Sequence, residues 1–182
     1  GDEFQINTYT SSNQVDPSVT ALDDGGFAVT WNSDGGHYGG SSNDIYAKTF
    51  TVTDASGNPV GTPQTQVDEF LVNTETHHNQ RDASIASLKD GGFVVTWEDQ
   101  EGHDGSKDGI FGQRFHTDGS RDGGEFQINT HTSSYQSNPA VATLEDGGFV
   151  VTWQSNNQEA GSNDLGIFAQ RYDKDGTAVD PE

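Results

Sequence analysis

The sequence lacks cysteine altogether, and it has only 8 Lys and Arg residues against 29 Asp and Glu, which gives a net charge of −21. Without cysteine there is no disulfide framework, no thiolate zinc site and no cysteine nucleophile. The scarcity of basic residues argues against nucleic acid and anionic membrane surfaces as partners, because both need clustered Lys and Arg. No stretch reaches the length of a transmembrane helix, and the first residues show no signal-peptide pattern. We therefore expect no nucleic-acid partner and no membrane insertion.

Hydrophobic residues are also scarce, at 29% of the chain, and 23 of the 182 residues are glycine. Such a composition together with a high net charge is typical of disordered chains. The apolar residues, however, gather in short alternating runs, which are typical of β-strands, and no window has helical periodicity. We therefore predict a folded, loop-rich, all-β protein with a thin core. Bound cations or a salty medium would relieve its self-repulsion.

Three repeats of one pattern run through the chain. Each begins with a strand-like segment, E-F-Q-I-N-T at 3–8 and 125–130 and E-F-L-V-N-T at 69–74. Each continues to a D-G-G-F-V-V-T-W motif, or D-G-G-F-A-V-T-W in the first repeat, which ends at Trp31, Trp97 or Trp153. We predict one repeat domain over residues 1–182, with units at about 1–66, 67–122 and 123–182 and four strands in each.

The Asp-Gly pair in each motif predicts a two-residue hairpin loop, because a type I′ turn needs positive φ at both positions. In this register Leu22 pairs with Phe27 and Ser18 pairs with Trp31, so that a small residue lies opposite the indole. Both faces of the hairpin are then apolar or small, which indicates a sheet packed between two others. We therefore predict β-propeller-like blades with the tryptophans in the core. A β-trefoil and a β-prism with pseudo-threefold symmetry are the alternatives.

Three blades are fewer than a propeller typically has. Because the chain starts on the strand that contains Phe4, this strand could complete the last blade, and two chains could then build six blades. Further repeats in a longer protein are the other possibility, and a trefoil or prism would close with three units. Open edge strands invite association, so we expect self-association or neighbouring repeats of a longer chain.

A family resemblance rests on the succession Q-x-x-P-x-V-x-x-L-x-D-G-G-F-V-V-T-W at 136–153, then G-I-F-A-Q-R-Y-D at 166–173 and the E-F-Q-I-N-T segment. The succession resembles a tandem repeat of very large secreted bacterial proteins, which are adhesin-like and often carry hemolysin-type (RTX) calcium-binding segments. The resemblance covers all three units. It implies a secreted or cell-surface, calcium-rich setting and a role in adhesion. The glycine-rich nonapeptide of RTX calcium rolls is absent, so those sites are not carried over.

An acidic loop follows each tryptophan and is a candidate calcium site, because hard cations take six to eight oxygen ligands from Asp, Asn, Ser and carbonyl groups. The predicted metal ligands are Asp34, Asp44, Asp104, Asp108 and Asp164. The alternative is that these side chains cap loop amides. Six residues after each tryptophan stand His37, His103 and Glu159, which would form a transition-metal site only if the three loops converged.

For catalysis the sequence offers no nucleophile elbow and no repeated His–carboxylate pair. The three units are also nearly equal, so each carries the same residues, whereas an active site needs different catalytic groups gathered in one place. We therefore expect a non-enzymatic, structural or adhesive module stabilised by calcium. The alternative is a multivalent lectin that binds extracellular glycans through loop residues such as Tyr38.

Overall fold

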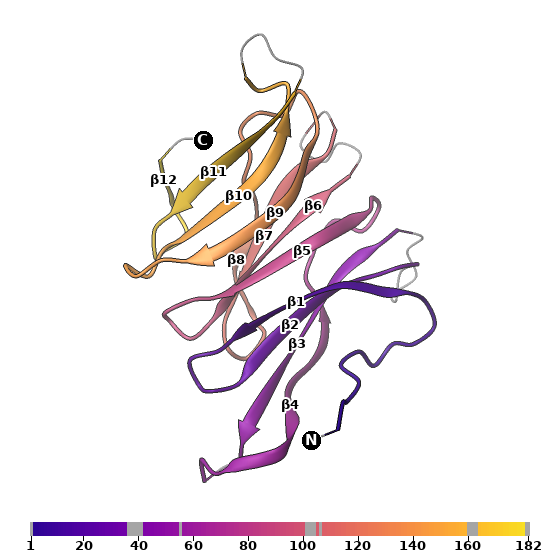
Figure 1. Cartoon of the computed structure of the whole chain (residues 1–182), viewed down its shortest axis with the longest axis vertical. Helices are drawn as coiled ribbons and strands as arrows, with labels where there is room; N and C mark the ends of the chain where they lie inside the picture. Colours follow the sequence, from indigo (N-terminus) through magenta and orange to yellow (C-terminus); the bar gives the residue numbers. More distant parts are fainter. Residues whose placement is uncertain are drawn as a thin grey trace.

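Figure 1 shows the computed structural model of the chain, in which residues 2–35, 42–54, 56–100, 105, 107–159 and 164–180 are described. Within these ranges the chain forms twelve β-strands. The strands build three antiparallel sheets of four, and in each sheet every strand pairs with its neighbours in sequence. None of the described residues forms a helix that is long and apolar enough to cross a membrane. The all-β prediction is confirmed.

We call the three sheets blades 1, 2 and 3. Blade 1 consists of β1 (Gln14–Ala21), β2 (Phe27–Ser33), β3 (Asp44–Thr53) and β4 (Pro59–Leu71). Blade 2 consists of β5 (Gln80–Ser87), β6 (Phe93–Asp99), β7 (Gly109–Phe115) and β8 (Arg121–Gln127). Blade 3 consists of β9 (Gln136–Thr143), β10 (Phe149–Asn156), β11 (Leu165–Tyr172) and β12 (Ala178–Asp180). The predicted unit boundaries at 67 and 123 fall inside β4 and β8, so a sequence unit is offset from a blade by part of one strand.

The blades are stacked face to face with blade 2 in the middle (Figure 1). Their first strands, β1, β5 and β9, lie side by side and form the inner edge of the stack, while β4, β8 and β12 lie outermost. Four-stranded meanders that pack on one another around their first strands are consecutive β-propeller blades. The predicted blade architecture is therefore confirmed. The N-terminal segment lies beside blade 1, at the far end of the stack from blade 3 (Figure 1).

Two apolar layers between the blades form the core, since alternate residues of a middle strand point to opposite faces. The layer between blades 1 and 2 includes Ile45, Ala47, Phe93, Val95 and Trp97. The layer between blades 2 and 3 includes Val94, Ile110, Phe149, Val151 and Trp153. The middle strand of blade 2 is therefore buried on both faces, and the tryptophans are core residues, as predicted.

The hairpin turns differ from the predicted two-residue loop. In blade 1, Phe27 pairs with Ala21, and Ser18 lies opposite Thr30 instead of the tryptophan. The turn holds three residues and ends on Gly25, whose φ is 84°. A three-residue loop that closes with a left-handed glycine is a common hairpin connection with a G1 bulge. The predicted register is therefore wrong by one residue.

The second glycine of the motif is required by packing. The Asp24 Oδ1 atom accepts a hydrogen bond from the Gly26 amide at 2.8 Å, which closes the turn. A Cβ atom on Gly26 would stand 2.2 Å from the carbonyl oxygen of Phe50 on the neighbouring strand. The same close approach recurs at Gly92 and Gly148. The D-G-G sequences at 24–26, 90–92 and 146–148 are therefore a structural signature of the blade.

A glutamine at the start of each inner strand holds the tryptophan of the same blade. The indole N–H donates to a glutamine Oε1 at 2.8 Å for Trp31, 2.8 Å for Trp97 and 3.1 Å for Trp153, with Gln14, Gln80 and Gln136 as the acceptors. A buried indole needs an acceptor for its single donor. The amide nitrogens of the three glutamines donate to backbone, at the carbonyls of Ser12, His78 and Ser134. The tryptophan bond was not predicted.

Candidate functional site

Each inner strand, β1, β5 or β9, is interrupted by one residue with left-handed backbone. This residue lies two positions after the glutamine that recurs in all three blades. The three residues are Asp16, Asp82 and Asn138, with φ values of 53°, 54° and 54°. The strand ladder shifts register around each of them, so they are β-bulges. Asp and Asn tolerate this conformation better than other side chains because they hydrogen-bond locally. Bulges and strained backbone of this kind concentrate at functional sites.

The bulge residue has a partner on the middle strand of its blade, directly after the tryptophan, and this partner differs between blades. In blade 1 the Asn32 Nδ2 atom donates to Asp16 Oδ2 at 2.9 Å. In blade 3 the Asn138 Nδ2 atom donates to Gln154 Oε1 at 3.4 Å. In blade 2 the position of the partner holds Glu98. The same backbone thus presents three different sets of polar groups.

In blade 2 the arrangement is ionic. Arg81 Nη2 lies 2.6 Å from Glu98 Oε1, and Arg81 Nε lies 3.5 Å from Asp82 Oδ2. The Glu98 side chain is fully buried, and its second oxygen, Oε2, has no hydrogen-bond partner among the described residues. The Gln100 side-chain oxygen, turned toward the guanidinium, accepts from Arg81 at 2.8 Å. Arg81 is therefore oriented by an amide and two carboxylates.

Two carboxyl groups in this region hold their protons unusually tightly. Burial raises the pKa of Glu98 to about 7, against the opposing effect of Arg81, and the charges of Asp108 and Asp82 raise it further. Burial also raises the pKa of Asp82, and Arg81 lowers it while the charge of Asp16 raises it. The charge of Asp16 on blade 1 therefore acts on Asp82 across the boundary between blades 1 and 2. Closely placed carboxylates with separated pKa values are typical of acid–base sites.

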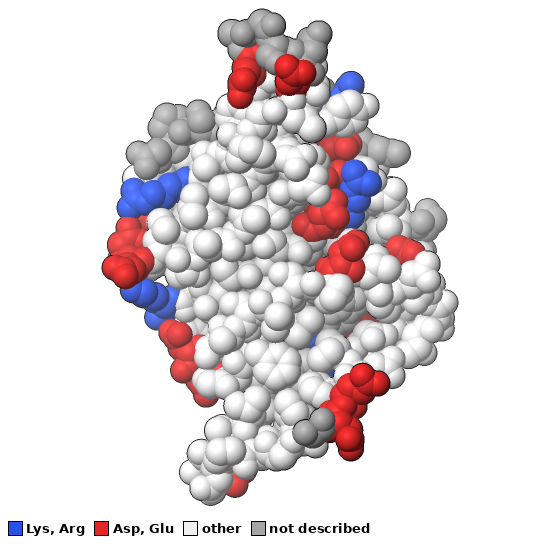
Figure 2. Space-filling model, in the orientation of Figure 1, with Lys and Arg blue, Asp and Glu red and all other residues white. Residues whose placement is uncertain are grey.

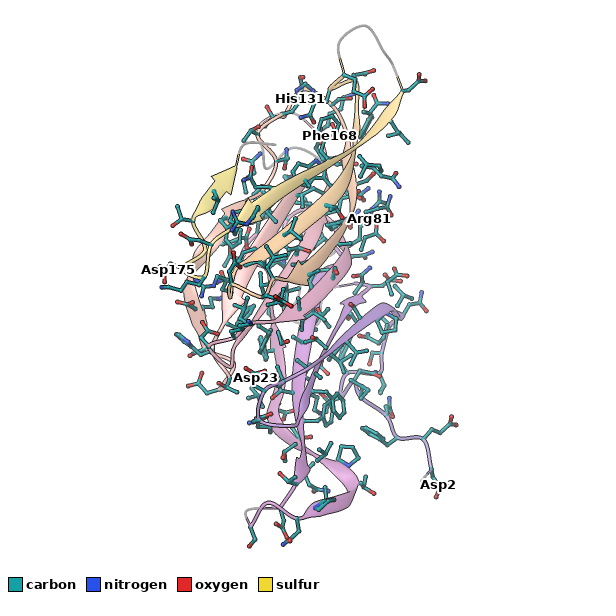
Figure 3. All side chains as sticks on the ribbon, turned by 60° about the vertical axis from the view of Figure 1, so that its left-hand side comes forward. Asp2, Asp23, Arg81, His131, Phe168 and Asp175 are labelled. Atoms are coloured by element: carbon teal, nitrogen blue, oxygen red, sulfur yellow. The ribbon has the colours of Figure 1, made fainter. Side chains whose placement is uncertain are left out.

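We call Asp16, Arg81, Asp82, Glu98 and Asp108 the inner-strand cluster. Figure 2 shows basic atoms surrounded by acidic ones at the end of β5 where this strand begins. In Figure 3, Arg81 lies on the opposite side of the molecule from Asp23 and Asp175, which mark the hairpin turns. Apart from Asp108, which was predicted as a calcium ligand, the sequence did not lead us to these residues. The signal that was available is an Asp or Asn inside each predicted inner strand, where such residues are unfavourable.

Four of the five predicted calcium ligands, Asp34, Asp44, Asp108 and Asp164, lie within the described part of the chain. The buried Asp44 side chain accepts from Asn73 Nδ2 at 2.8 Å, and burial raises its pKa. Asp34 accepts from Asn13 Nδ2 at 2.9 Å. Asp108 contributes to the inner-strand cluster, and Asp164 accepts the amide of Asn157 through its backbone oxygen at 3.4 Å. Asp104 lies outside the described residues.

The other predicted ligand residues are mostly outside the described part of the chain. This holds for His37, Tyr38 and His103, while Glu159 is described and exposed. Among the described residues, no three His, Asp or Glu side chains are grouped so that they would hold a metal ion. Calcium binding therefore stays a prediction, and a convergent site of the three loops is not supported by the described residues.

A hollow with a volume of about 540 Å³ lies at the hairpin end of blades 2 and 3. Its charged lining includes Lys89, Asp90, Arg114, Asp122, Asp146 and Lys174. Arg114 pairs with Asp90 at 3.2 Å and with Asp122 at 2.9 Å, and Lys174 pairs with Asp175 at 2.7 Å. Figure 2 shows acidic and basic atoms alternating along this edge. These charges are matched within the chain, so we assign the hollow no ligand.

Comparison with known proteins gives matches among solved structures. No protein-family model matches the sequence, and no curated protein matches it. A structure titled "Hadza microbial sialidase Hz136" is similar over 91% of this chain and 36% of its own, at 11% identity and a TM-score of 0.62. An α-L-arabinofuranosidase from Lactobacillus brevis is similar over 96% of this chain and 57% of its own, at 13% identity and a TM-score of 0.54. A thermostable family-43 glycoside hydrolase is similar over 93% of this chain and 58% of its own, at 12% identity and a TM-score of 0.53.

These similarities establish the propeller-type fold and correct one expectation. The chain spans between about a third and three fifths of the length of these structures. The expectation of a non-enzymatic adhesive module or lectin is wrong on this comparison, because blades of this kind build glycoside hydrolases. The reason we gave, that repetition excludes an active site, fails physically: the backbone repeats, but the side chains at the bulges do not. The resemblance to secreted repeat proteins, and the secreted location that it implies, stay predictions.

Proposed function

We propose that this chain acts on carbohydrate and takes part in the hydrolysis of a glycosidic bond at the inner-strand cluster. In this proposal Asp82 is the general acid and Asp16 is the carboxylate on the other side of the bond. Glycoside hydrolysis commonly uses two carboxyl groups, one protonated and one ionised, on either side of the scissile bond. The observation that carries the proposal is the pair of bulge aspartates on neighbouring inner strands, of which Asp82 has its pKa raised by burial and by Asp16.

Arg81 and Glu98 are positioning residues in this proposal. The Glu98 side chain is fully buried, so it acts on the site through Arg81, which is 42% exposed. The guanidinium touches both Glu98 and Asp82, and it therefore fixes the Asp82 carboxyl group. Arg81 also presents donors to solvent that suit sugar hydroxyl groups. The solved structures with similar blades support this choice of substrate class, since their titles name a sialidase, an arabinofuranosidase and a family-43 glycoside hydrolase.

Turnover of chromogenic glycosides tests the proposal. The panel contains aryl α-L-arabinofuranosides, β-D-xylosides and sialosides, together with arabinan and xylan oligosaccharides. We expect Asp82→Asn and Asp16→Asn each to lower kcat/KM by roughly 10²–10⁴-fold, the usual contribution of a general acid or base. We also expect the rate to fall as the pH rises through the raised pKa of Asp82, because the acid must hold its proton.

The matched control is Asp23→Asn, which removes the same charge at a hairpin turn on the other side of the molecule (Figure 3). This variant should keep the wild-type rate. Calorimetric titration with the oligosaccharides provides a second readout that does not depend on turnover. The proposal is wrong if the wild-type chain neither binds nor cleaves any of these glycans, or if cleavage survives in both cluster variants.

A further inference from the structure

The N-terminal segment Glu3–Thr8 lies against blade 1 in the way that the internal E-F-x-x-N-T segments lie against blades 2 and 3. Its sequence, E-F-Q-I-N-T, is identical to that of 125–130. The Phe4 ring meets Phe50 at 5.8 Å, edge to face. The internal counterparts make the same contact with the next blade, at 5.2 Å for Phe70–Phe115 and 5.5 Å for Phe126–Tyr172. Ile6 packs on the cluster of blade 1 that contains Trp31 and Tyr46.

The two internal segments also belong to the preceding blade. Leu71 pairs with Tyr46 of β3, and Gln127 pairs with Phe111 of β7. The next residues continue this contact, since the amide of Val72 donates to Ile45 O at 2.8 Å. The amide of Ile128 donates to Ile110 O at the same distance. Each internal segment therefore completes one blade and covers the next.

An asparagine side chain in each internal segment also bonds to the third strand of the preceding blade. Asn73 Oδ1 accepts the amide of Ile45 at 2.8 Å, and Asn129 Oδ1 accepts the amide of Ile110 at 2.7 Å. The N-terminal segment has the corresponding residue, Asn7. Residues 2–13 are assigned to no strand, so within the described chain the segment makes only the second of its two contacts.

In blade 3, the strand that corresponds to β3 and β7 is β11, and the start of β11 is exposed. Ile45 and Ile110 are 0% exposed where the next blade covers them, whereas their counterpart Ile167 is 72% exposed. Leu165 on the same strand is 61% exposed. β12 pairs with β11 at Arg171 and Tyr172, which leaves the earlier part of β11 without an outer strand among the described residues. In blades 1 and 2 the E-F-x-x-N-T segment occupies that place.

We propose that a second copy of this chain docks head to tail on blade 3. The segment Glu3–Thr8 of the second copy adds to β11 as an outer strand, and blade 1 of that copy covers Ile167. This contact continues the interface that already joins blade 1 to blade 2 and blade 2 to blade 3. Strand addition of this kind combines backbone hydrogen bonds with pockets for alternate side chains. One chain cannot make the contact with itself, because its N-terminal segment and β11 lie at opposite ends of the stack (Figure 1).

A repeated glutamate–threonine bond extends the same register. The amide and hydroxyl of Thr8 both donate to Glu69 Oε2 at 2.7 Å. Those of Thr74 donate to Glu125 Oε2 at 2.7 and 2.8 Å. The Thr8–Glu69 bond therefore joins the N-terminal segment to the second E-F-x-x-N-T segment in the same way that the Thr74–Glu125 bond joins the second to the third. The proposed contact between copies is heterologous, so it closes into a ring if the rotation between copies permits and otherwise forms a chain of copies.

The charge of the protein gives the association an unusual salt dependence. Each copy carries a net charge of −21, so two copies repel one another at low ionic strength. The proposed contact itself is apolar and backbone-mediated. We therefore expect association to strengthen as salt screens the repulsion. This proposal does not depend on the hydrolytic function.

Sedimentation velocity and light scattering of the whole chain test the contact. We expect dimers or larger species whose fraction rises with protein and salt concentration. Phe4→Asp and Ile167→Asp, on the two sides of the contact, should each give monomers. Ile167→Asp changes a residue that is 72% exposed, so it should also keep the melting temperature of the dilute wild-type chain. The control Val179→Asp changes an apolar residue that is 45% exposed and outside the contact, and it should associate like the wild type. A wild-type chain that stays monomeric at its highest soluble concentration in high salt would overturn the proposal.

Disulfide trapping tests the register. The chain has no native cysteine, so only the introduced cysteines can form a disulfide. Within the chain, Phe126 pairs with Gly112 of β7. Phe4 is the counterpart of Phe126 and Ala169 is the counterpart of Gly112, so Phe4 of one copy should lie opposite Ala169 of the other. A Phe4→Cys chain mixed with a differently tagged Ala169→Cys chain should form a mixed disulfide within minutes of mild oxidation. Phe4→Cys mixed with Val179→Cys is the control. Equal trapping in both mixtures would show that the copies do not meet in this register.

Discussion

Each blade has a tryptophan side, where the indole bonds to the glutamine of the inner strand, and a bulge side, which is the left-handed residue two positions after that glutamine. The two sides differ in how far they are repeated across the three blades. At the tryptophan side the same pair recurs three times, an indole that donates to the glutamine at the start of the inner strand. At the bulge side the backbone recurs with φ values of 53° to 54°, while the side chains change from Asp16 to Asp82 to Asn138. The first region holds the blade together, and the second varies on a fixed backbone. The difference shows where a repeated fold has room for a single asymmetric site.

The largest effect is expected on the tryptophan side. Trp97→Ala should lower the free energy of unfolding by roughly 3–5 kcal/mol, because it leaves a cavity between two blades and an unpaired Gln80 amide oxygen. Denaturant unfolding measures this loss. Tyr135→Ala, which truncates an aromatic side chain that is 50% exposed, should cost less than about 1 kcal/mol. Equal effects of the two substitutions would contradict the structural role of the tryptophan side.

A smaller, pH-dependent effect is expected on the bulge side. The pKa of Glu98 is raised from 4.5 to about 7 in the folded chain, so the folded state holds a proton that the unfolded state releases. The free energy of unfolding therefore falls as the pH rises from 4.5 to 7, by up to about 3 kcal/mol from this group. Glu98→Gln should remove this slope, and the gap between variant and wild type should widen toward pH 8.

Urea unfolding of the wild type and Glu98→Gln at several pH values between 4 and 8 gives the difference in their free energies of unfolding. The contributions of the other carboxylates cancel in this difference. Gln also keeps an acceptor for Arg81, so the variant retains the contact that orients the guanidinium. Parallel pH profiles for the two proteins would mean that Glu98 is ionised in the folded chain across this range.

The smallest effect concerns the backbone of the bulge itself. Asn138→Ala should cost about 1 kcal/mol, because alanine fits poorly at a φ of 54°. Asn138→Gly should cost less, since glycine adopts this conformation freely. Thermal unfolding of the two variants gives the order. If alanine were tolerated as well as glycine, the left-handed backbone would not be the reason for Asp and Asn at these positions.

Much of the fold could be predicted from the sequence. The alternation around Phe93, Val95 and Trp97 identifies a strand whose every second residue is buried, and three repeats of it identify three blades. The hairpin register was missed because an Asp-Gly pair fits two kinds of turn. Here the close approach of Gly92 to the Phe115 carbonyl accompanies the three-residue loop, and this contact comes from another strand. The acidic loops drew attention in the sequence because acids are dense there, and calcium binding by these loops stays a prediction.

The sequence by itself determined the β-strands, the number of blades and the burial of the tryptophans, because these follow from local alternation and its repetition. Only the tertiary structure decided which acids act on one another. Asp16 and Asp82 are 66 positions apart, and the charge of Asp16 acts on Asp82 because β1 lies beside β5. Glu98 joins them because it pairs with Arg81 on the neighbouring strand. The shift of a pKa depends on burial and on neighbours in space, and neither can be read from spacing along the chain. The exposure of Ile167, whose counterparts are buried, likewise became visible only when the blades were stacked.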